Sequence, residues 1–181
     1  SSPIAFGDPK NPRLLCWMRN DLWSLNSKDG SVRQHARFRS TMDASVNAAT
    51  PVAIGEGDYF ISAGYGVGAS TWSLEPDDAE FKGRELKSGL FESHYSTPVA
   101  HDSHLYGFHD RQETGQTLRC IDLTEGKLCW DSLSVPGGTL LIIDDKLVCI
   151  TEQGELLVVK ASPEKFHPLL TTQVLRAGHR S

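Results

Sequence analysis

The sequence lacks most features that would place it in a common functional class. Its apolar runs are far shorter than the ~18 residues of a membrane-spanning helix. Its four cysteines form no Cys-x-x-Cys pair, so we expect no structural zinc site. With 18 Lys and Arg against 23 Asp and Glu, the net charge is −5, which argues against a general nucleic-acid binder. The first residues show no basic region followed by an apolar one, so no signal peptide is predicted.

Two of the cysteines, Cys120 and Cys129, flank the turn Asp122–Lys127. We therefore expect them near each other on adjacent strands. A disulfide is compatible with this placement, but a pair of buried reduced thiols is favoured. The redox compartment stays open at this point.

Short alternating stretches separated by polar turns make up most of the chain. The clearest example lies between Ser96 and Trp130, where Val, Ile, Leu, Tyr and Trp alternate with Asp, Ser, Gly and Thr. This pattern predicts four strands, at Thr97–Ala100, His104–Phe108, Thr117–Leu123 and Lys127–Trp130.

The same pattern recurs along the chain. Thr97–Val99 reappears 47 residues earlier as Thr50–Val52, and at that offset Tyr106 falls on Tyr59. We predict four units, at residues 2–39, 50–87, 96–134 and 138–175. Units of about forty residues with four strands each are typical of β-propeller blades, so the predicted fold is an all-β propeller with about four four-stranded antiparallel blades. A β-sandwich with accidental internal similarity is the alternative.

The remaining strands follow from the same alternation. They are predicted at Arg13–Arg19, Asp21–Asn26 and Val32–Phe38; at Pro51–Ile54, Asp58–Ala63, Ser70–Leu74 and Glu80–Lys87; and at Thr139–Ile143, Lys146–Thr151, Glu155–Lys160 and His167–Val174. No helix is predicted, and at most Pro163–Phe166 could form one helical turn.

Within the third unit, the stretch Cys120–Trp130 resembles the repeat of quinoprotein-type propellers, which is known as the tryptophan-docking motif. Asp122 can accept hydrogen bonds from turn amides, Gly126 can supply a positive φ, and Trp130 can pack between neighbouring blades. Cys120 replaces the usual alanine. The first unit carries a partial copy with Asn26, Gly30 and Gln34 at the matching positions.

The wider chain is similar to the PQQ-like β-propeller proteins of bacteria, a group labelled after the outer-membrane assembly lipoprotein or polyvinyl-alcohol dehydrogenase. The likeness covers residues 43–69, 93–120 and 137–156. It implies a closed ring of seven or eight blades outside the cytoplasm, of which this chain would be a part. We therefore expect bare apolar faces, covered by further blades or by self-association, at Leu169, Leu170, Val174 and Leu175 and at Ile4, Phe6, Leu14 and Leu15.

The resemblance also raises an enzymatic alternative, a fragment of a PQQ-dependent alcohol dehydrogenase. Such enzymes hold the quinone between a tryptophan and a disulfide of adjacent cysteines, with calcium on Glu and Asn and an Asp as base. This sequence has no Cys-Cys pair, and strand packing explains Trp17, Trp23, Trp72 and Trp130. We expect no cofactor and no catalytic residue, with PQQ and calcium as the alternative.

The histidines do not predict a metal site. His101 and His104 should flank the turn between the first two strands of their unit, whereas His94 and His109 should lie at the opposite end. This split makes a shared metal ion improbable.

Propeller topology brings the turn between strands two and three and the link between blades to one face. The candidate binding residues on that face are Asn47, Tyr65, His94, Tyr95, His109, Arg111 and Glu113, together with Arg19–Asp21, Asp110, Gln112, Glu152, Gln153 and Arg180. Paired charges with tyrosine and histidine can recognise a peptide or a sugar. We expect a non-catalytic binding scaffold for a protein or polymer partner; a merely solvated loop face is the alternative. A kelch- or WD-type module is disfavoured because its repeat residues are missing.

Overall fold

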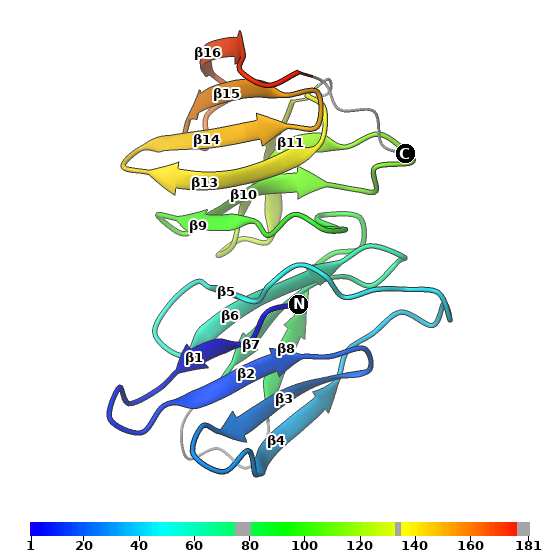
Figure 1. Cartoon of the computed structure of the whole chain (residues 1–181), viewed down its shortest axis with the longest axis vertical. Helices are drawn as coiled ribbons and strands as arrows, with labels where there is room; N and C mark the ends of the chain where they lie inside the picture. The colour runs from blue at the N-terminus through cyan, green and yellow to red at the C-terminus, as the bar shows by residue number, and fades with distance from the viewer. Residues whose placement is uncertain (75–80, 133–134, 177–181) are drawn as a thin grey trace. The chain divides into compact units, whose positions relative to one another are not determined.

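The structure, a computed structural model, describes residues 1–74, 81–132 and 135–176. All regular secondary structure in these residues is β-strand, arranged as four four-stranded antiparallel sheets (Figure 1). The blades predicted from the sequence repeat are therefore present. Among the described residues, no helix is long and apolar enough to span a membrane.

Each sheet is a meander in which strand order follows chain order. Blade 1 contains β1 (Ile4–Phe6), β2 (Arg13–Trp17), β3 (Asp21–Asn26) and β4 (Val32–Arg37); blade 2 contains β5 (Val52–Ala53), β6 (Asp58–Ala63), β7 (Gly68–Ser73) and β8 (Lys82–Glu85). Blade 3 contains β9 (Val99–His101), β10 (His104–His109), β11 (Thr117–Asp122) and β12 (Lys127–Asp131); blade 4 contains β13 (Gly138–Ile143), β14 (Lys146–Thr151), β15 (Glu155–Lys160) and β16 (Pro168–Gln173).

The chain forms two compact units. Unit 1, Ser1–Tyr95, contains blades 1 and 2, and unit 2, Ser96–Ser181, contains blades 3 and 4.

The inner strands match their predicted bounds more closely than the outer strands do. The strands Asp58–Ala63 and Lys146–Thr151 are as predicted, whereas the outer strand expected at His167–Val174 is Pro168–Gln173. The outer strand expected at Glu80–Lys87 is Lys82–Glu85, and Glu80 lies outside the described residues. An outer strand pairs on one side only, so side-chain alternation fixes its ends less firmly.

The core of unit 1 lies between blades 1 and 2. Phe6, Leu15 and Trp17 from blade 1 pack with Tyr59 and Ile61 from blade 2. The expectation that Ile4, Phe6 and Leu15 lie on a bare outer face is therefore wrong. Because side chains alternate along a strand, Leu14 lies on the face of β2 opposite to Leu15.

The core of unit 2 lies between blades 3 and 4 and includes Trp130. Its indole packs with Tyr106 at a ring distance of 6.0 Å and with Phe166 at 5.7 Å. The Trp130 Nε1 donates a hydrogen bond of 2.7 Å to the carbonyl of Ser162, which follows β15 in the next blade. Trp130 thus joins the two blades by packing and by one directional bond.

The turn before Trp130 is held by Asp122 and Gly126. The Asp122 carboxylate accepts hydrogen bonds of 2.9 Å from the backbone N–H groups of Thr124 and Glu125, which lower its pKa. Gly126 has φ +63°, a conformation that side chains disfavour. In blade 1, Asn26 accepts the N–H of Lys28 at 2.9 Å and so makes a similar contact with an amide oxygen.

All four cysteines are free thiols. Cys16, Cys120 and Cys149 are buried, and Cys129 is half-buried. Burial raises the pKa of the Cys149 thiol to about 12 and also raises the pKa of Cys120. Neither of these two thiols is ionised near neutral pH, which disfavours a nucleophilic role for them.

One face of blade 4 carries a continuous aliphatic row. Leu141, Val148, Val158 and Leu170 are paired in register across β13, β14, β15 and β16, on the face opposite to the core. Leu141 is 50% exposed and Leu170 is 47% exposed. Large exposed apolar patches mark interaction surfaces on soluble proteins, so this face is a candidate for one.

We expect Trp130→Ala to lower the free energy of unfolding by about 3–5 kcal/mol, because it removes a buried ring and its hydrogen bond. Leu128→Ala, in the same strand at 47% exposure, should cost less than about 1 kcal/mol. Urea denaturation of both variants measures the difference. Equal costs for the two substitutions would contradict the role assigned to Trp130.

We also expect the chain to self-associate through the aliphatic face of blade 4. Leu141→Lys combined with Leu170→Lys should reduce the associated fraction in sedimentation velocity, because a lysine in a buried apolar interface loses its hydration. Thr171→Lys is the control, since Thr171 is exposed on the opposite face of β16. An equal reduction by Thr171→Lys would show that net charge, not this face, controls association.

Candidate functional site

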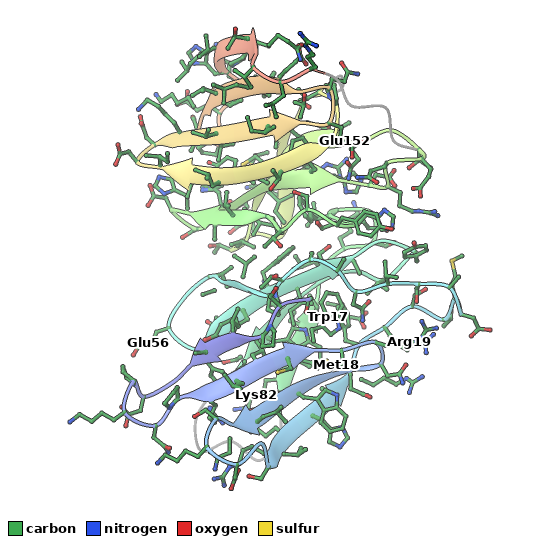
Figure 2. The ribbon with its side chains drawn as sticks, in the orientation of Figure 1. Trp17, Met18, Arg19, Glu56, Lys82 and Glu152 are labelled. Atoms are coloured by element: carbon green, nitrogen blue, oxygen red, sulfur yellow. The ribbon has the colours of Figure 1, made fainter. Side chains whose placement is uncertain are left out.

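The loops at one end of each blade carry the candidate residues. In unit 1 these are the turn between β2 and β3, the turn between β6 and β7, and the segments that follow β4 and β8. Figure 2 shows Met18 and Arg19 at this end of blade 1 and Glu56 at the opposite end of blade 2. We call these two turns and two segments the upper loops of unit 1.

Asn47 serves the structure of these loops. Its Nδ2 donates hydrogen bonds to the carbonyls of Met18 at 2.9 Å and Arg19 at 3.1 Å, and its own carbonyl accepts the N-terminal amine of Ser1 at 2.9 Å. The link between blades 1 and 2 is thereby fixed to the turn between β2 and β3.

Two arginines fix the rest of this link. The Arg19 guanidinium donates to the carbonyl of Ser45 at 3.4 Å and to that of Asp43. Arg39 donates to the side-chain oxygen of Asn20 at 2.8 Å and to the carbonyl of Ser40 at 2.6 Å. Hydrogen bonds from charged donors are the stronger ones, so these loops are ordered before any partner binds.

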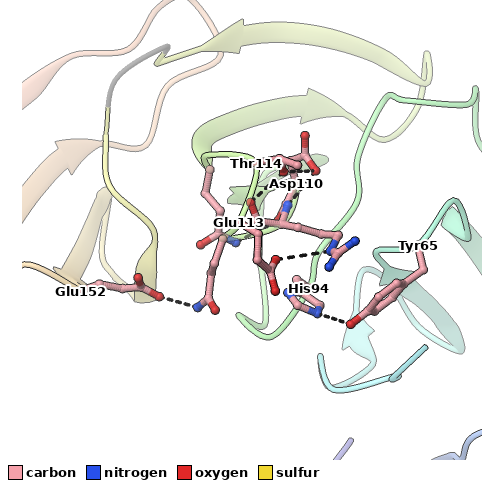
Figure 3. A network of polar contacts seen from close by, with 9 residues as sticks. Tyr65, His94, Asp110, Glu113, Thr114 and Glu152 are labelled. Carbon is pink, nitrogen blue, oxygen red and sulfur yellow. Dashed lines mark hydrogen bonds and ion pairs between the residues drawn. The ribbon is translucent and has the colours of Figure 1, made fainter. Parts of the chain in front are cut away.

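Tyr65, His94 and Tyr95 form an aromatic group in the same loops. The Tyr65 hydroxyl and His94 Nε2 are 2.9 Å apart (Figure 3), and the His94 and Tyr95 rings are 3.8 Å apart. His94 is fully buried, whereas Tyr95 is 49% exposed. The group therefore presents the Tyr95 ring on a rigid support.

Tyr65 adopts a backbone conformation that is rare for residues other than glycine. Its φ is +63°, and such a conformation costs about 1–3 kcal/mol and persists only where the surrounding structure holds it. Here the Ser40 hydroxyl donates to the Tyr65 carbonyl at 2.8 Å, and the ring is bonded to His94. Strained residues held in this way are found preferentially at functional sites.

Exposed apolar side chains lie among these loops, and the sequence reasoning missed them. Met18 is 59% exposed, Met42 49% and Val46 38%. Both methionines of the chain are thus on the upper loops. Single methionines in polar turns were the signal that could have indicated them.

In unit 2, His109 lies at the end of β10 close to an ion pair. Arg119 and Asp131, which face each other in β11 and β12, form hydrogen bonds of 2.6 and 2.9 Å, with side chains only 13% and 15% exposed. Burial, and then the positive charge of Arg119, lower the pKa of His109 to about 4. His109 is therefore neutral near pH 7 and contributes no charge to binding.

The turn after His109 is internally paired. The Asp110 carboxylate accepts the backbone N–H of Arg111 at 2.7 Å and the hydroxyl of Thr114 at 3.1 Å. Arg111 Nε lies 3.4 Å from the Glu113 carboxylate (Figure 3). The candidate pair Arg111 and Glu113 is thus brought together, in a turn whose shape its own side chains maintain.

A pocket of about 350 Å³ opens beside this turn. It is lined by Gln112, Gly115, Gln116, Val135, Pro136, Gly137, Glu152 and Gln153. Gln112 Nε2 donates to the carboxylate of Glu152, and both residues line the pocket (Figure 3). The turn between β10 and β11, the link between blades 3 and 4 and the turn between β14 and β15 all contribute to the pocket.

The remaining histidines lie as expected. His101 and His104 face each other across the turn between β9 and β10, at the end of blade 3 opposite to His109. Within the described part of the chain, no group of His, Cys, Asp and Glu could hold a metal ion. Arg180 lies outside the described residues.

The residues present do not fit PQQ with calcium. Trp17 donates its Nε1 to the carbonyl of Phe38 in the core, Trp72 and Trp130 are buried in the cores, and Trp23 stacks on His35 at 4.9 Å. No tryptophan face is therefore presented to a planar cofactor by the upper loops. The two amide donors of Asn47 are engaged by backbone carbonyls, and the cysteines lie on separate strands.

Several solved structures share the fold of this chain. BamB from Moraxella catarrhalis is 15% identical with a TM-score of 0.60, over 95% of this chain and 51% of BamB. The computationally designed protein Ika8 is 11% identical with a TM-score of 0.60, over 97% of this chain and 50% of Ika8. Apo AztD from Citrobacter koseri is 16% identical with a TM-score of 0.56, over 95% of this chain and 47% of AztD.

At these identities the likeness shows the fold. The chain has the β-propeller fold of BamB and AztD, and it spans about half the length of these chains. No protein-family model matches the sequence, and no curated protein matches it.

We expect acid to destabilise the chain partly through His109. Its pKa is about 4 in the folded chain and near 6.5 when unfolded. The unfolded chain therefore binds a proton first, and the stability due to neutral His109 is lost as the pH falls from about 6.5 to 4. His109→Gln should flatten this part of the curve of unfolding free energy against pH. An NMR titration midpoint of His109 near 6.5 would contradict the assignment.

Proposed function

We propose that this chain is part of a non-catalytic β-propeller that acts as a scaffold and binds a protein or polymer partner through its upper loops. The resemblance noted from the sequence implies an extracytoplasmic, periplasmic location, and we extend the proposal to that compartment. The proposed residues of unit 1 are Tyr65, Tyr95, Met18 and Met42. In unit 2, considered by itself, the proposed residues are Arg111 and Glu113 in the turn between β10 and β11.

One observation carries the proposal: exposed apolar side chains lie on loops that are already fixed. Met18, Met42 and Tyr95 are each about half exposed, while Arg19 and Arg39 tie the surrounding backbone. Methionine, tyrosine and arginine are enriched at protein interfaces. Preorganised loops lose little entropy on binding, which favours affinity.

The chemistry of the ionisable groups supports binding rather than catalysis. Buried Cys120 and Cys149 have raised pKa values, so these thiols are poor nucleophiles. His109 is partly buried beside an ion pair, and its low pKa makes it a weak base. The misfit of the tryptophans and cysteines to PQQ likewise disfavours the dehydrogenase alternative.

The proposal is tested with a photo-crosslinking amino acid placed at Tyr95 or at Leu128. The two positions are equally exposed, at 49% and 47%, but Leu128 lies beside the turn at the opposite end of blade 3. In a bacterial periplasmic extract, we expect a discrete crosslinked product from position 95 and not from position 128. Mass spectrometry of the product identifies the partner.

Surface variants provide the second half of this test. Met18→Ser combined with Met42→Ser removes two exposed apolar contacts. We expect a loss of about 1.4 kcal/mol in binding free energy, which is tenfold in affinity, and a crosslink at position 95 reduced by about the same factor. Val32→Ser, at 52% exposure on β4, is the matched control. Equal crosslinking from positions 95 and 128, or an equal effect of Val32→Ser, would overturn the proposal.

A further inference from the structure

Gln116 is a buried polar residue at the pocket of unit 2, and its orientation is fixed. The side chain is only 8% exposed, and its Nε2 donates a hydrogen bond of 3.0 Å to the carbonyl of Asp110. A carbonyl can only accept, so the amide nitrogen must face Asp110. The amide oxygen, Oε1, therefore faces the other way.

Gln116 Oε1 lies against the pocket wall at Gly137. A Cβ atom on Gly137 would come within 1.8 Å of this oxygen, so any side chain at this position would displace it. Gln116 and Gly137 both line the pocket. Among the described residues, no donor is bonded to Gln116 Oε1, so this oxygen can accept a hydrogen bond from a ligand.

The rest of the pocket is acidic and rich in acceptors. Glu152 lines it and brings a negative charge, and its carboxylate accepts a hydrogen bond from Gln112. Asp110 and Glu113 in the adjoining turn outweigh the one positive charge of Arg111. Val135 and Pro136 supply an apolar wall. The matching ligand carries several N–H donors, a positive charge and an apolar stem.

We propose that this pocket binds an arginine side chain of a protein partner. A guanidinium offers five N–H donors in a plane, and its three methylene groups suit the wall of Val135 and Pro136. A volume of about 350 Å³ admits one such side chain. A sugar suits the pocket less well, because none of its described lining residues is aromatic and could stack on a sugar ring. This inference rests on the proposed scaffold function and names the partner chemistry at the unit 2 loops.

The probe is the blocked peptide acetyl-Gly-Arg-Gly-amide, titrated into the ¹⁵N-labelled full chain. We expect saturable shifts of the Gly137 backbone amide and the Gln116 side-chain amide. The same peptide with citrulline in place of arginine keeps the shape but loses the charge. It should bind at least about fivefold more weakly, since charge-assisted hydrogen bonds are about twice as strong as neutral ones. Equal affinity for the two peptides, or no shift at either amide, overturns the inference.

Variants separate the pocket from general electrostatic attraction. Glu152→Gln should weaken binding of the arginine peptide at least about fivefold, because it removes the negative charge of a lining residue. Glu125→Gln, which makes the same change in the exposed turn at the opposite end of blade 3, should leave binding unchanged. An equal effect of the two variants overturns the inference, and so does a shift of the same amides by maltotriose but not by the arginine peptide.

The crosslinking and the peptide titration together distinguish a wrong pocket assignment from a wrong scaffold function. If the crosslink from Tyr95 forms while the arginine peptide does not bind, the scaffold function stands and the pocket assignment fails. If the arginine peptide binds with the expected preferences and no crosslink forms from any upper loop, the scaffold function fails and the pocket is a site for free guanidinium compounds.

Discussion

Every blade of this chain is a thin antiparallel sheet with two faces, and an apolar face contributes to stability only when another element covers it. In unit 1 the face of β2 that carries Leu15 and Trp17 meets blade 2, and in unit 2 Trp130 docks on the backbone of the next blade. The strands are therefore committed to packing. Since the inward side chains serve a neighbouring blade, the loops are left to carry the partner binding that we propose.

Equivalent positions of three blades show how tolerant this packing is. The pair opposite each other on strands three and four is Arg119 with Asp131 in blade 3 and Trp23 with His35 in blade 1. In blade 2, Trp72 faces Gly83, where a Cβ atom would lie 2.8 Å from the indole. An ion pair, an aromatic stack and a ring over glycine thus occupy one position of the fold. The backbone ladder sets the architecture, and the side chains need only fill it.

Much of the fold could be predicted because strand alternation and turn chemistry are local. The inner strands at Asp58–Ala63 and Lys146–Thr151 have their predicted bounds, and the turn at Asp122 and Gly126 could be anticipated from residue types. Which of the two faces of a strand meets the neighbouring blade could not be predicted. Assigning Leu15 to the outer face failed because alternation gives two sets of side chains without saying which set meets the neighbouring blade.

The candidate site shows a similar division between what is local and what is not. Topology was enough to place Tyr65 and His94 on loops at one end of unit 1, but not to show that His94 is buried beneath Tyr95. Nothing near Gln116 in the sequence suggests a buried acceptor. Its role depends on Asp110, six residues earlier, and on Gly137, which follows β12 and leads into the next blade. A site assembled from the backbone of two loops has no sequence motif. It requires only a carbonyl at Asp110, which any residue supplies, and the absence of a side chain at Gly137.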